Sequence, residues 1–570
     1  MEIEQADNRK PRPNGHKQEY FIFFLASVFF VAASLFNFST QSPKFTKWLS
    51  PDETANYAFT KNFALTGQMT IKEPLNPKVD GIVHPRSMMV QGDELKPMSF
   101  LGIIILYGKA AQWTDVAVIP FLTPLIGAIG LIIFYFLASR LFDRRTALLA
   151  ACLLAFFPPY FYYSSRSMFH NIPFTVFALA GILFAVAMNQ KAKHAWVQKF
   201  LYPALAGLFL GLAAITRTSE LLWLGPTLVI LWLLNVKNTG VVKLSVLLAF
   251  LAIGVLPAAY YSQILHGSPI ATGYPQMNSS LSQLGQTGTQ LITSGITETS
   301  LWQKIRDLIF YFGFNPKQTA KMTYNYFFAM FGWLFWGAVL GAVIFMVQFR
   351  KIRKRQLLFV FSFAVLSIIL LFYYGSWEFY DNPDPTKATL GNSYTRYWLP
   401  VYLGSIILAA LGINRLSRLL KNRNLRHAAR LLTVGVFMLW GVTFSLTGKD
   451  EGLIESYYKQ RSSQEEWKQV LAATEDNAVI ITKYHDKLFF PERKVVYGLF
   501  DDDNMNRTYA KLVKLAPTYY YNFTFPPKAL DYLNRNKLAK SGLTIKKVRT
   551  MNPTFTLYKL ESAKQSYAKY

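Results

Sequence analysis

The stretch YFIFFLASVFFVAASLFNF, residues 20–38, decides the fold of this chain. It carries no charged side chain and is close to the roughly 20 apolar residues that a helix needs to cross a bilayer. No small-residue cleavage site separates it from the polar sequence that follows. We therefore predict an uncleaved first transmembrane span rather than a signal peptide.

Similar apolar runs recur along the chain. They lie near residues 117–138, 147–163, 171–188, 200–216, 220–235, 241–262, 324–347, 356–374, 396–413 and 428–446. With the first run they predict a mostly α-helical, polytopic membrane protein of about eleven transmembrane helices. Residues 98–111 are apolar but too short to cross a membrane, so we expect a helix in the interface there.

Composition supports a membrane protein. Of the 570 residues, 52% are hydrophobic and only 16% are charged, against roughly 25% charged in soluble proteins. The net charge of +28 would suggest nucleic acid in a soluble protein, but in a membrane protein basic residues mark cytoplasmic loops. We predict membrane lipids and no nucleic acid as partners. The single cysteine, Cys152, lies in an apolar run, which excludes a disulfide framework and a cysteine-based zinc site.

Lysine and arginine cluster in alternate loops. The clusters lie within residues 1–20, 140–145, 191–199, 237–243, 350–355 and 415–430. This asymmetry predicts a cytoplasmic N-terminus, and an odd number of spans then places the C-terminus outside. The long segments 39–98, 263–323 and 448–570 would face the outside. Because no organelle address is present, we expect a prokaryotic inner membrane.

Three regions follow from this topology: a cytoplasmic tail at 1–20, a membrane domain at 21–447 and an extracytoplasmic tail at 448–570. Helical and strand patterns alternate in the last region, with strands expected near residues 478–482, 495–497, 518–523, 543–548 and 554–560. Such alternation predicts a small α/β domain. We expect this domain to shape acceptor access rather than to take part in chemistry.

Two adjacent carboxylates follow the first span, in Ser50-Pro51-Asp52-Glu53. In one interpretation they open a helix, with Asp52 as its cap and Glu53 in its first turn. In the other they serve chemistry, because carboxylates at a membrane surface are costly to desolvate unless they are used or hydrated. The local sequence leaves both open.

Further motifs follow in order along the chain. His84-Pro85-Arg86 and Lys96-Pro97 lie in the first outer loop, Thr216-Arg217 ends a glycine-containing span, and Arg396-Tyr397 precedes Pro400 at the entry of a late span. Over residues 20–445 this arrangement resembles the class C (GT-C) glycosyltransferases. The protein O-mannosyltransferases and the bacterial aminoarabinose transferases are the most similar groups.

The resemblance implies a glycosyltransferase that takes a sugar from a polyprenyl-phosphate-linked donor. The acceptor would be a glycan, lipid or protein on the outer side, and the anomeric centre would invert. Asp52 would be the general base, and Glu53 would position the acceptor or a cation. The donor phosphate would need fixed cations, with Arg396 as the principal ligand and Lys96, Arg217 and Arg166 as further candidates.

One departure from the family pattern concerns His170 and Asn171, which stand where many relatives carry a second acidic residue. They would either hydrogen-bond a sugar hydroxyl or cap a helix. Further candidates for acceptor or sugar contacts are His84, Arg86, Tyr57, Trp377 and Glu378. The sequence has no cofactor motif, and it leaves a divalent cation at the carboxylates open.

Two alternatives remain at this stage. A lipid-linked glycan ligase or polymerase of related architecture would transfer an oligosaccharide. A lipid or sugar transporter or flippase belongs to another class, and the sequence shows no inverted pair of broken helices of the kind typical of one.

Overall fold

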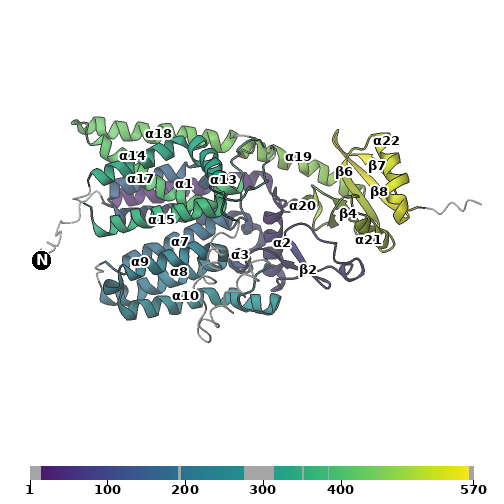
Figure 1. Ribbon diagram of the computed structural model, residues 1–570, viewed down its shortest axis with the longest axis horizontal. Helices are drawn as coiled ribbons and strands as arrows, with labels where there is room; N and C mark the ends of the chain where they lie inside the picture. The colour runs from purple at the N-terminus through teal and green to yellow at the C-terminus, as the bar shows by residue number, and fades with distance from the viewer. Residues whose placement is uncertain are drawn as a thin grey trace, which may run out of the picture.

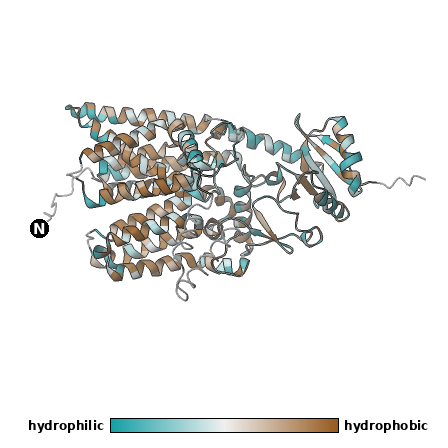
Figure 2. Ribbon diagram, in the orientation of Figure 1, coloured by the Kyte–Doolittle hydropathy of each residue, from teal (hydrophilic) through white to brown (hydrophobic). Residues whose placement is uncertain are grey.

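The computed structural model describes residues 15–190, 194–274, 313–348, 352–382, 384, 386–448 and 450–563. A long bundle of helices occupies one half of the molecule, and strands and shorter helices occupy the other (Figure 1). Hydrophobic residues dominate the bundle (Figure 2). The basic residues Arg9, Lys10, Arg12, Lys191, Lys193, Arg350 and Lys351 and much of the segment 263–323 lie outside the described residues.

Seven described stretches are long and apolar enough to cross a membrane. They contain α1 (Gly15–Thr40), α4 (Ile119–Leu141), α8 (Tyr202–Thr216), α10 (Val236–His266), α15 (Lys354–Gly375), α17 (Leu399–Ser417) and α18 (Arg423–Thr447). In α17, 78% of the most apolar window is buried, against 6% in α10. Since both are strongly apolar, α17 forms the centre of the bundle and α10 is suited to face lipid.

Two further spans are bent. Helix α5 (Arg144–Ala155) meets α6 (Pro158–Ser165) at 55°, and the helical segment Pro316–Ala329, which includes α13 (Pro316–Thr323), meets α14 (Gly332–Val347) at 94°. Proline at the start of α6 removes a backbone donor there, which favours the break. Two of the spans are therefore interrupted, a feature that the apolar runs of the sequence did not indicate.

The bent pairs bring the count to as many as nine spans. The two other predicted runs are also helical but short: α7 (Asn171–Ala187) and the segment Thr218–Leu233, which includes α9 (Leu221–Leu233). A mostly helical membrane fold is thus confirmed, whereas the number eleven stays a prediction.

The first outer loop folds as a unit next to the bundle. It contains α2 (Pro51–Thr66), an antiparallel sheet of β1 (Ile71–Lys72), β3 (Glu94–Pro97) and β2 (Met88–Gln91) in that spatial order, and α3 (Gly102–Trp113). Helix α3 packs against α2 and α8. A Cβ on Gly102 would lie 2.5 Å from the Thr216 Cα. Only glycine therefore allows this approach, which places the loop against the residue preceding Arg217.

The C-terminal segment begins with α19 (Leu453–Ala472) and builds a five-stranded mixed sheet. Its order is β5 (Lys494–Tyr497), β4 (Val479–Thr482), β6 (Thr518–Phe523), β8 (Phe555–Ser562) and β7 (Leu543–Thr550). Strand β4 is parallel to β5 and β6, whereas β8 is antiparallel to β6 and β7. Helices α20 (Asp486–Phe489), α21 (Asp503–Val513) and α22 (Pro527–Tyr532) connect the strands. The strands lie close to where the alternating pattern predicts them.

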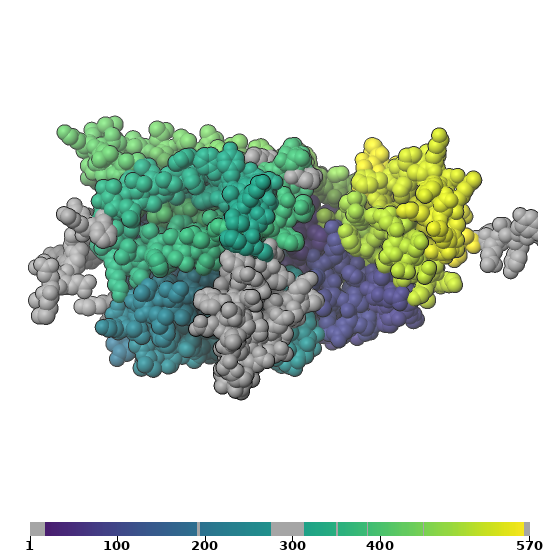
Figure 3. Space-filling view, viewed as in Figure 1, coloured from purple at the N-terminus to yellow at the C-terminus, as the bar shows by residue number. Residues whose placement is uncertain are grey.

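This segment is not a separate body. Phe59 and Met88 of the first loop share one hydrophobic core with Phe489 and Tyr521 of the tail, and the two parts are in contact in Figure 3. Four ion pairs also join them: Lys47–Glu492, Glu73–Lys494, Asp80–Lys511 and Arg86–Asp486. The tail and the first outer loop therefore form one folded unit.

Candidate active site

The first turn of α2 separates the two adjacent carboxylates. Ser50, not Asp52, is the N-cap, and its backbone N–H donates to Glu53 Oε2 at 2.9 Å, which closes a capping box. Successive helical residues point about 100° apart, so Asp52 and Glu53 face different surroundings. The interpretation of Asp52 as the helix cap is wrong.

Glu53 is fully buried and forms an ion pair with Arg166, whose Nε lies 3.2 Å from Glu53 Oε1. Arg166 also donates to the Tyr162 hydroxyl at 2.9 Å. A buried carboxylate needs such compensation. Both side chains are therefore engaged with each other, and the predicted roles of Glu53 toward acceptor or cation and of Arg166 toward the donor phosphate stay predictions.

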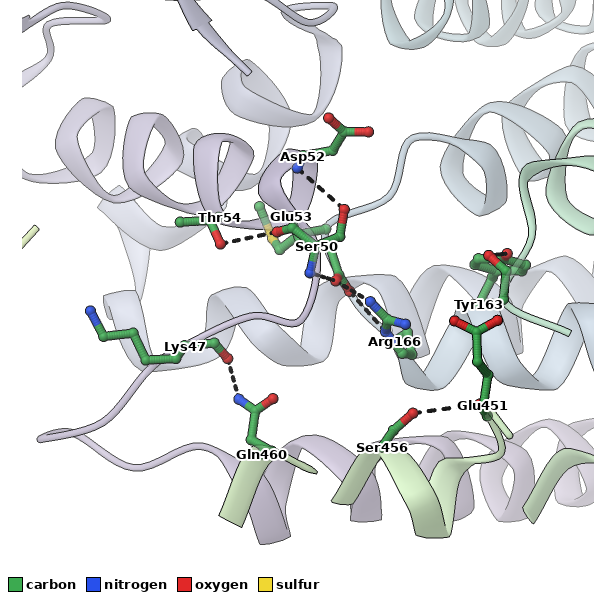
Figure 4. A network of polar contacts seen from close by, with 12 residues as sticks. Lys47, Ser50, Asp52, Glu53, Thr54, Tyr163, Arg166, Glu451, Ser456 and Gln460 are labelled. Atoms are coloured by element: carbon green, nitrogen blue, oxygen red, sulfur yellow. Dashed lines mark hydrogen bonds and ion pairs between the residues drawn. The ribbon is translucent and has the colours of Figure 1, made fainter. Parts of the chain in front are cut away.

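Asp52 points away from this pair (Figure 4). Its Oδ1 accepts a hydrogen bond of 2.6 Å from the Ser87 hydroxyl. Its Oδ2 makes no hydrogen bond to any residue that the structure describes, and the side chain is partly exposed. One oxygen of Asp52 is thus oriented and the other is available, as a general base requires.

Three arginines and two aromatic rings form a chain of contacts beside α2. The Phe169 ring lies 5.4 Å from the Arg166 guanidinium carbon and 4.5 Å from that of Arg396. The Tyr397 ring lies 5.2 Å from Arg396 and 4.7 Å from Arg217. The rings attract the cations that they separate, and this lets three like charges share one site.

Arg396 is the middle cation and the exception among the three. Arg166 pairs with Glu53, and Arg217 pairs with Glu220 at 2.7 Å while donating to the Tyr374 hydroxyl. Within the described residues Arg396 has no carboxylate partner. Its Nη2 donates to Ser393 Oγ at 2.8 Å, and its Nε is buried without an acceptor.

Asp52 interacts electrostatically with Arg396, as does Asp381, and Tyr274 lies in the field of both Asp52 and Arg396. A guanidinium without an ion pair within the described residues, in the field of an available carboxylate, is suited to hold an anion near a base. The engagement of Arg217 with Glu220 weakens its predicted role as a direct phosphate ligand.

His170 stands at the N-cap position of α7 but makes no capping hydrogen bond. Its Nε2 instead lies 3.1 Å from Asn56 Nδ2 and 3.2 Å from Ser99 Oγ. Burial, with Arg217 and Arg396 nearby, lowers the pKa of His170 to about 3, so the ring is neutral at physiological pH. The neighbouring Asn171 donates to the Arg396 carbonyl oxygen at 3.4 Å. Helix capping by this pair is therefore wrong.

Lys96 is buried on β3, and its ammonium donates to Gln91 Oε1 at 2.6 Å and to the Leu265 carbonyl at 2.8 Å. Leu265 lies in the last turn of α10, where a positive charge complements the helix dipole. Like Arg396, Lys96 has no carboxylate partner in the described parts of the chain. It stays a candidate phosphate ligand.

The other residues predicted to contact an acceptor or sugar interact with other parts of the protein. Tyr57 packs on Trp48 with ring centres 5.4 Å apart, and Arg86 pairs with Asp486. His84 Nδ1 lies 2.8 Å from the Pro85 carbonyl, Glu378 lies 3.5 Å from Lys321, and Trp377 is 49% exposed. No described contact joins Tyr57, Trp377 or Glu378 to Asp52 or Arg396. A role of these side chains toward an acceptor or sugar stays a prediction.

Sequence reasoning missed several residues that build the site. Ser87 and Phe169 carry no motif, and Asp486 lies 400 residues from its partner Arg86. Tyr397 was detectable, because an aromatic residue next to a candidate phosphate ligand suggests cation–π support.

Comparisons with known proteins complete the description of the site. The family model described as dolichyl-phosphate-mannose-protein mannosyltransferase matches residues 111–261. No curated protein sequence shows significant similarity to the chain.

Solved structures are similar over most of the chain. ArnT from Cupriavidus metallidurans, bound to undecaprenyl phosphate, has a TM-score of 0.57 and 11% identity, covering 96% of this chain and 98% of its own. The Archaeoglobus fulgidus oligosaccharyltransferase, tethered with an acceptor peptide, has a TM-score of 0.55 and 15% identity over 90% of this chain and 69% of its own. The same archaeal enzyme, AglB, in complex with an inhibitory peptide and a dolichol-phosphate has a TM-score of 0.53 and 13% identity, over 90% and 70% of the chains.

The fold is that of the GT-C membrane glycosyltransferases. The predicted resemblance is thereby confirmed. The side of the membrane on which each terminus lies stays a prediction. Within the described residues, no three His, Cys, Asp or Glu side chains gather in a way that could hold a metal ion, so a divalent cation also stays a prediction.

Proposed function

We propose that this chain transfers a sugar from a polyprenyl-phosphate-linked donor to an acceptor on the extracytoplasmic side of the membrane. Asp52 is the general base and Arg396 the principal ligand of the donor phosphate. The outer location rests on the basic clusters in alternate loops, which mark the opposite, cytoplasmic side.

One observation carries the proposal. Of the three arginines joined by Phe169 and Tyr397, only Arg396 lacks an ion-paired carboxylate within the described residues, and Asp52, with one oxygen available, interacts with it electrostatically. A phosphate on Arg396 would satisfy the buried Nε donor that has no acceptor. The similarity in fold to ArnT and AglB, which were solved with undecaprenyl phosphate and dolichol-phosphate, supports this ligand class.

The reaction follows from this arrangement. The acceptor oxygen attacks the anomeric carbon while its proton passes to Asp52, and the bond between that carbon and the phosphate oxygen breaks. The electron pair of the broken bond stays on the departing polyprenyl phosphate, whose negative charge Arg396 stabilises. Because attack and departure occur on opposite faces of the sugar, one displacement inverts the anomeric centre.

Native mass spectrometry of lipids that co-purify with the protein tests the donor class. We expect a polyprenyl phosphate carrying one sugar, which is then supplied with candidate acceptors in an assay for released polyprenyl phosphate. A carrier with an oligosaccharide would instead indicate the ligase or polymerase alternative. Movement of the intact donor across a vesicle membrane without release of its phosphate would indicate a flippase.

A further inference from the structure

Asp486 is a carboxylate of the tail that is completely buried where the tail meets the first outer loop. It accepts hydrogen bonds from Arg86 Nη2 at 2.6 Å and Nε at 3.1 Å, and a third from the Arg86 backbone N–H at 2.9 Å. The two ends of this contact lie 400 residues apart in the chain. Asp486 therefore holds both the side chain and the backbone of Arg86.

Ser87, the next residue, has an unusual backbone conformation, with φ of 63°. Residues other than glycine seldom adopt this left-handed region, and it persists where neighbouring structure enforces it. Two contacts enforce it here, because Asp486 binds the Arg86 backbone before Ser87, and Met88 begins strand β2 after it. In this conformation the Ser87 hydroxyl donates to Asp52 Oδ1 at 2.6 Å.

We propose that Asp486 is a positioning residue for Asp52. Its ion pair with Arg86 holds the turn at residues 84–88 so that the Ser87 hydroxyl orients the Asp52 carboxylate. The inference rests on the proposed function, because it assigns the tail a part in preparing the base of that reaction. The tail then contributes to chemistry and not only to acceptor access.

The other ion pairs between tail and loop provide the contrast. Glu73 accepts a hydrogen bond from Lys494 at 2.6 Å, and Asp80 one from Lys511 at 2.9 Å. Neither partner adjoins a residue that contacts Asp52. Of the four described pairs, Arg86–Asp486 is the one that includes a backbone hydrogen bond next to the Asp52 ligand. An ion pair that only held the tail against the loop would not need this backbone hydrogen bond next to Ser87.

The charged and titratable groups near Asp52 are Arg86 of the turn, Arg396 of α16 (Ser393–Tyr397) and Tyr274, which follows α10. Lys487 adjoins Asp486 and lies near Arg86. A hydrogen bond to the ionised carboxylate favours the ionised form. Loss of the Ser87 contact therefore removes an interaction that favours the ionised Asp52 carboxylate, whatever these other charges contribute.

The test measures binding of undecaprenyl phosphate to the full-length protein as a function of pH. Ionised Asp52 repels the phosphate, so protonation of Asp52 strengthens binding, and this part of the profile is absent in Asp52→Asn. Subtraction of the Asp52→Asn profile also removes the titration of the phosphate itself, which occurs near pH 6. The midpoint of the difference depends on the surroundings of the Asp52 carboxylate and is measured without any need for turnover.

We expect Asp486→Asn to raise this midpoint by about one unit, which is roughly a tenfold change in proton affinity. Glu73→Gln is the matched control, because it also converts a carboxylate of a pair between tail and loop into an amide, and it should leave the midpoint unchanged. Ser87→Gly should shift the midpoint like Asp486→Asn, and it should fold because glycine tolerates the positive φ.

Equal midpoints in wild type, Ser87→Gly and Asp486→Asn would overturn the inference and leave the proposed function standing. If Asp486→Asn does not fold, an unshifted midpoint in Ser87→Gly is sufficient to overturn it. Coincident profiles of wild type and Asp52→Asn would instead contradict the placement of Asp52 beside the donor phosphate. The proposed function and this inference would then fail together.

Discussion

Arg166 and Glu53 form a buried ion pair between the end of the bent α5–α6 span and the first turn of α2. The pair holds the first outer loop against the bundle, and it joins two residues that the sequence suggested for substrate contacts. The side chain of Asp52, the residue before Glu53, points away from this pair and lies in a different environment.

Breaking this pair should destabilise the protein. Glu53→Gln leaves the Arg166 guanidinium buried without its counter-charge, and such a loss costs about 3–5 kcal/mol. Thermal unfolding in detergent should show a large drop in midpoint for Glu53→Gln and for Arg166→Met. The unfolding midpoint of the double variant should fall by less than the sum of the two single decreases. Asp531→Asn, which breaks an exposed pair with Arg535, should change little. Additive losses would mean that the pair is not coupled.

Asp52→Asn should abolish transfer while the protein still folds and binds the donor at least as tightly, because the charge that repels the phosphate is removed. The amide keeps the shape of the carboxylate but cannot take a proton, and a positioned base contributes about 10²–10⁴-fold to the rate. Asp115 caps a short helix in the same region by accepting from the Ala117 N–H. Asp115→Asn is therefore the matched control and should keep its activity, because Asn caps as well as Asp. Near-normal turnover of Asp52→Asn would end the assignment of Asp52 as base.

Arg396→Ala should weaken binding of undecaprenyl phosphate by roughly ten- to a hundredfold, since a charge-assisted hydrogen bond contributes about 1.5–3 kcal/mol. Arg396→Lys should recover only part of the affinity, because lysine lacks the planar fork and stacks less well on Phe169 and Tyr397. Isothermal titration calorimetry measures the affinity of both variants for undecaprenyl phosphate. If Arg396→Ala binds undecaprenyl phosphate with wild-type affinity, another cation must be the phosphate ligand, and Lys96 is the next candidate.

His170 should make the stability of the folded protein depend on pH. Its pKa of about 3 in the folded protein lies below the value near 6.5 of the unfolded chain. Between these values the unfolded chain binds a proton that the folded protein does not, so stability falls as pH drops through the window. The unfolding midpoint of wild type relative to His170→Gln should therefore decrease from pH 6.5 downward. A constant difference would show that His170 is protonated in the folded protein.

Truncation after Thr447 should damage the first outer loop. The loop and the tail share a core that includes Phe59, Met88, Phe489 and Tyr521. Removal of the tail would expose the loop residues of this core to solvent. Limited proteolysis should cut within residues 39–98 faster in the truncated chain, and binding of undecaprenyl phosphate should weaken. Resistance equal to the full chain would show that the loop folds without the tail.

Much of the fold was predictable from sequence, because its signals are local. The run at residues 20–38 is apolar over enough residues to span a bilayer, and it is helical as α1. The α/β alternation of the tail also follows local patterns, and β4 and β6 lie close to the expected positions. The packing of the tail against the loop was not predictable, because no periodicity in the sequence records which apolar faces meet.

The site divides in the same way. From the sequence it is already evident that Asp52 and Glu53 stand together after the first span and that arginines end later segments. Which of these charges are neutralised depends on the folded chain. Glu53 meets Arg166 across 113 residues, Asp486 meets Arg86 across 400, and Arg396 meets no described carboxylate. The physical reason is that helix direction separates neighbours by about 100°, whereas ion pairing in a buried site depends on distances that only the packed chain sets.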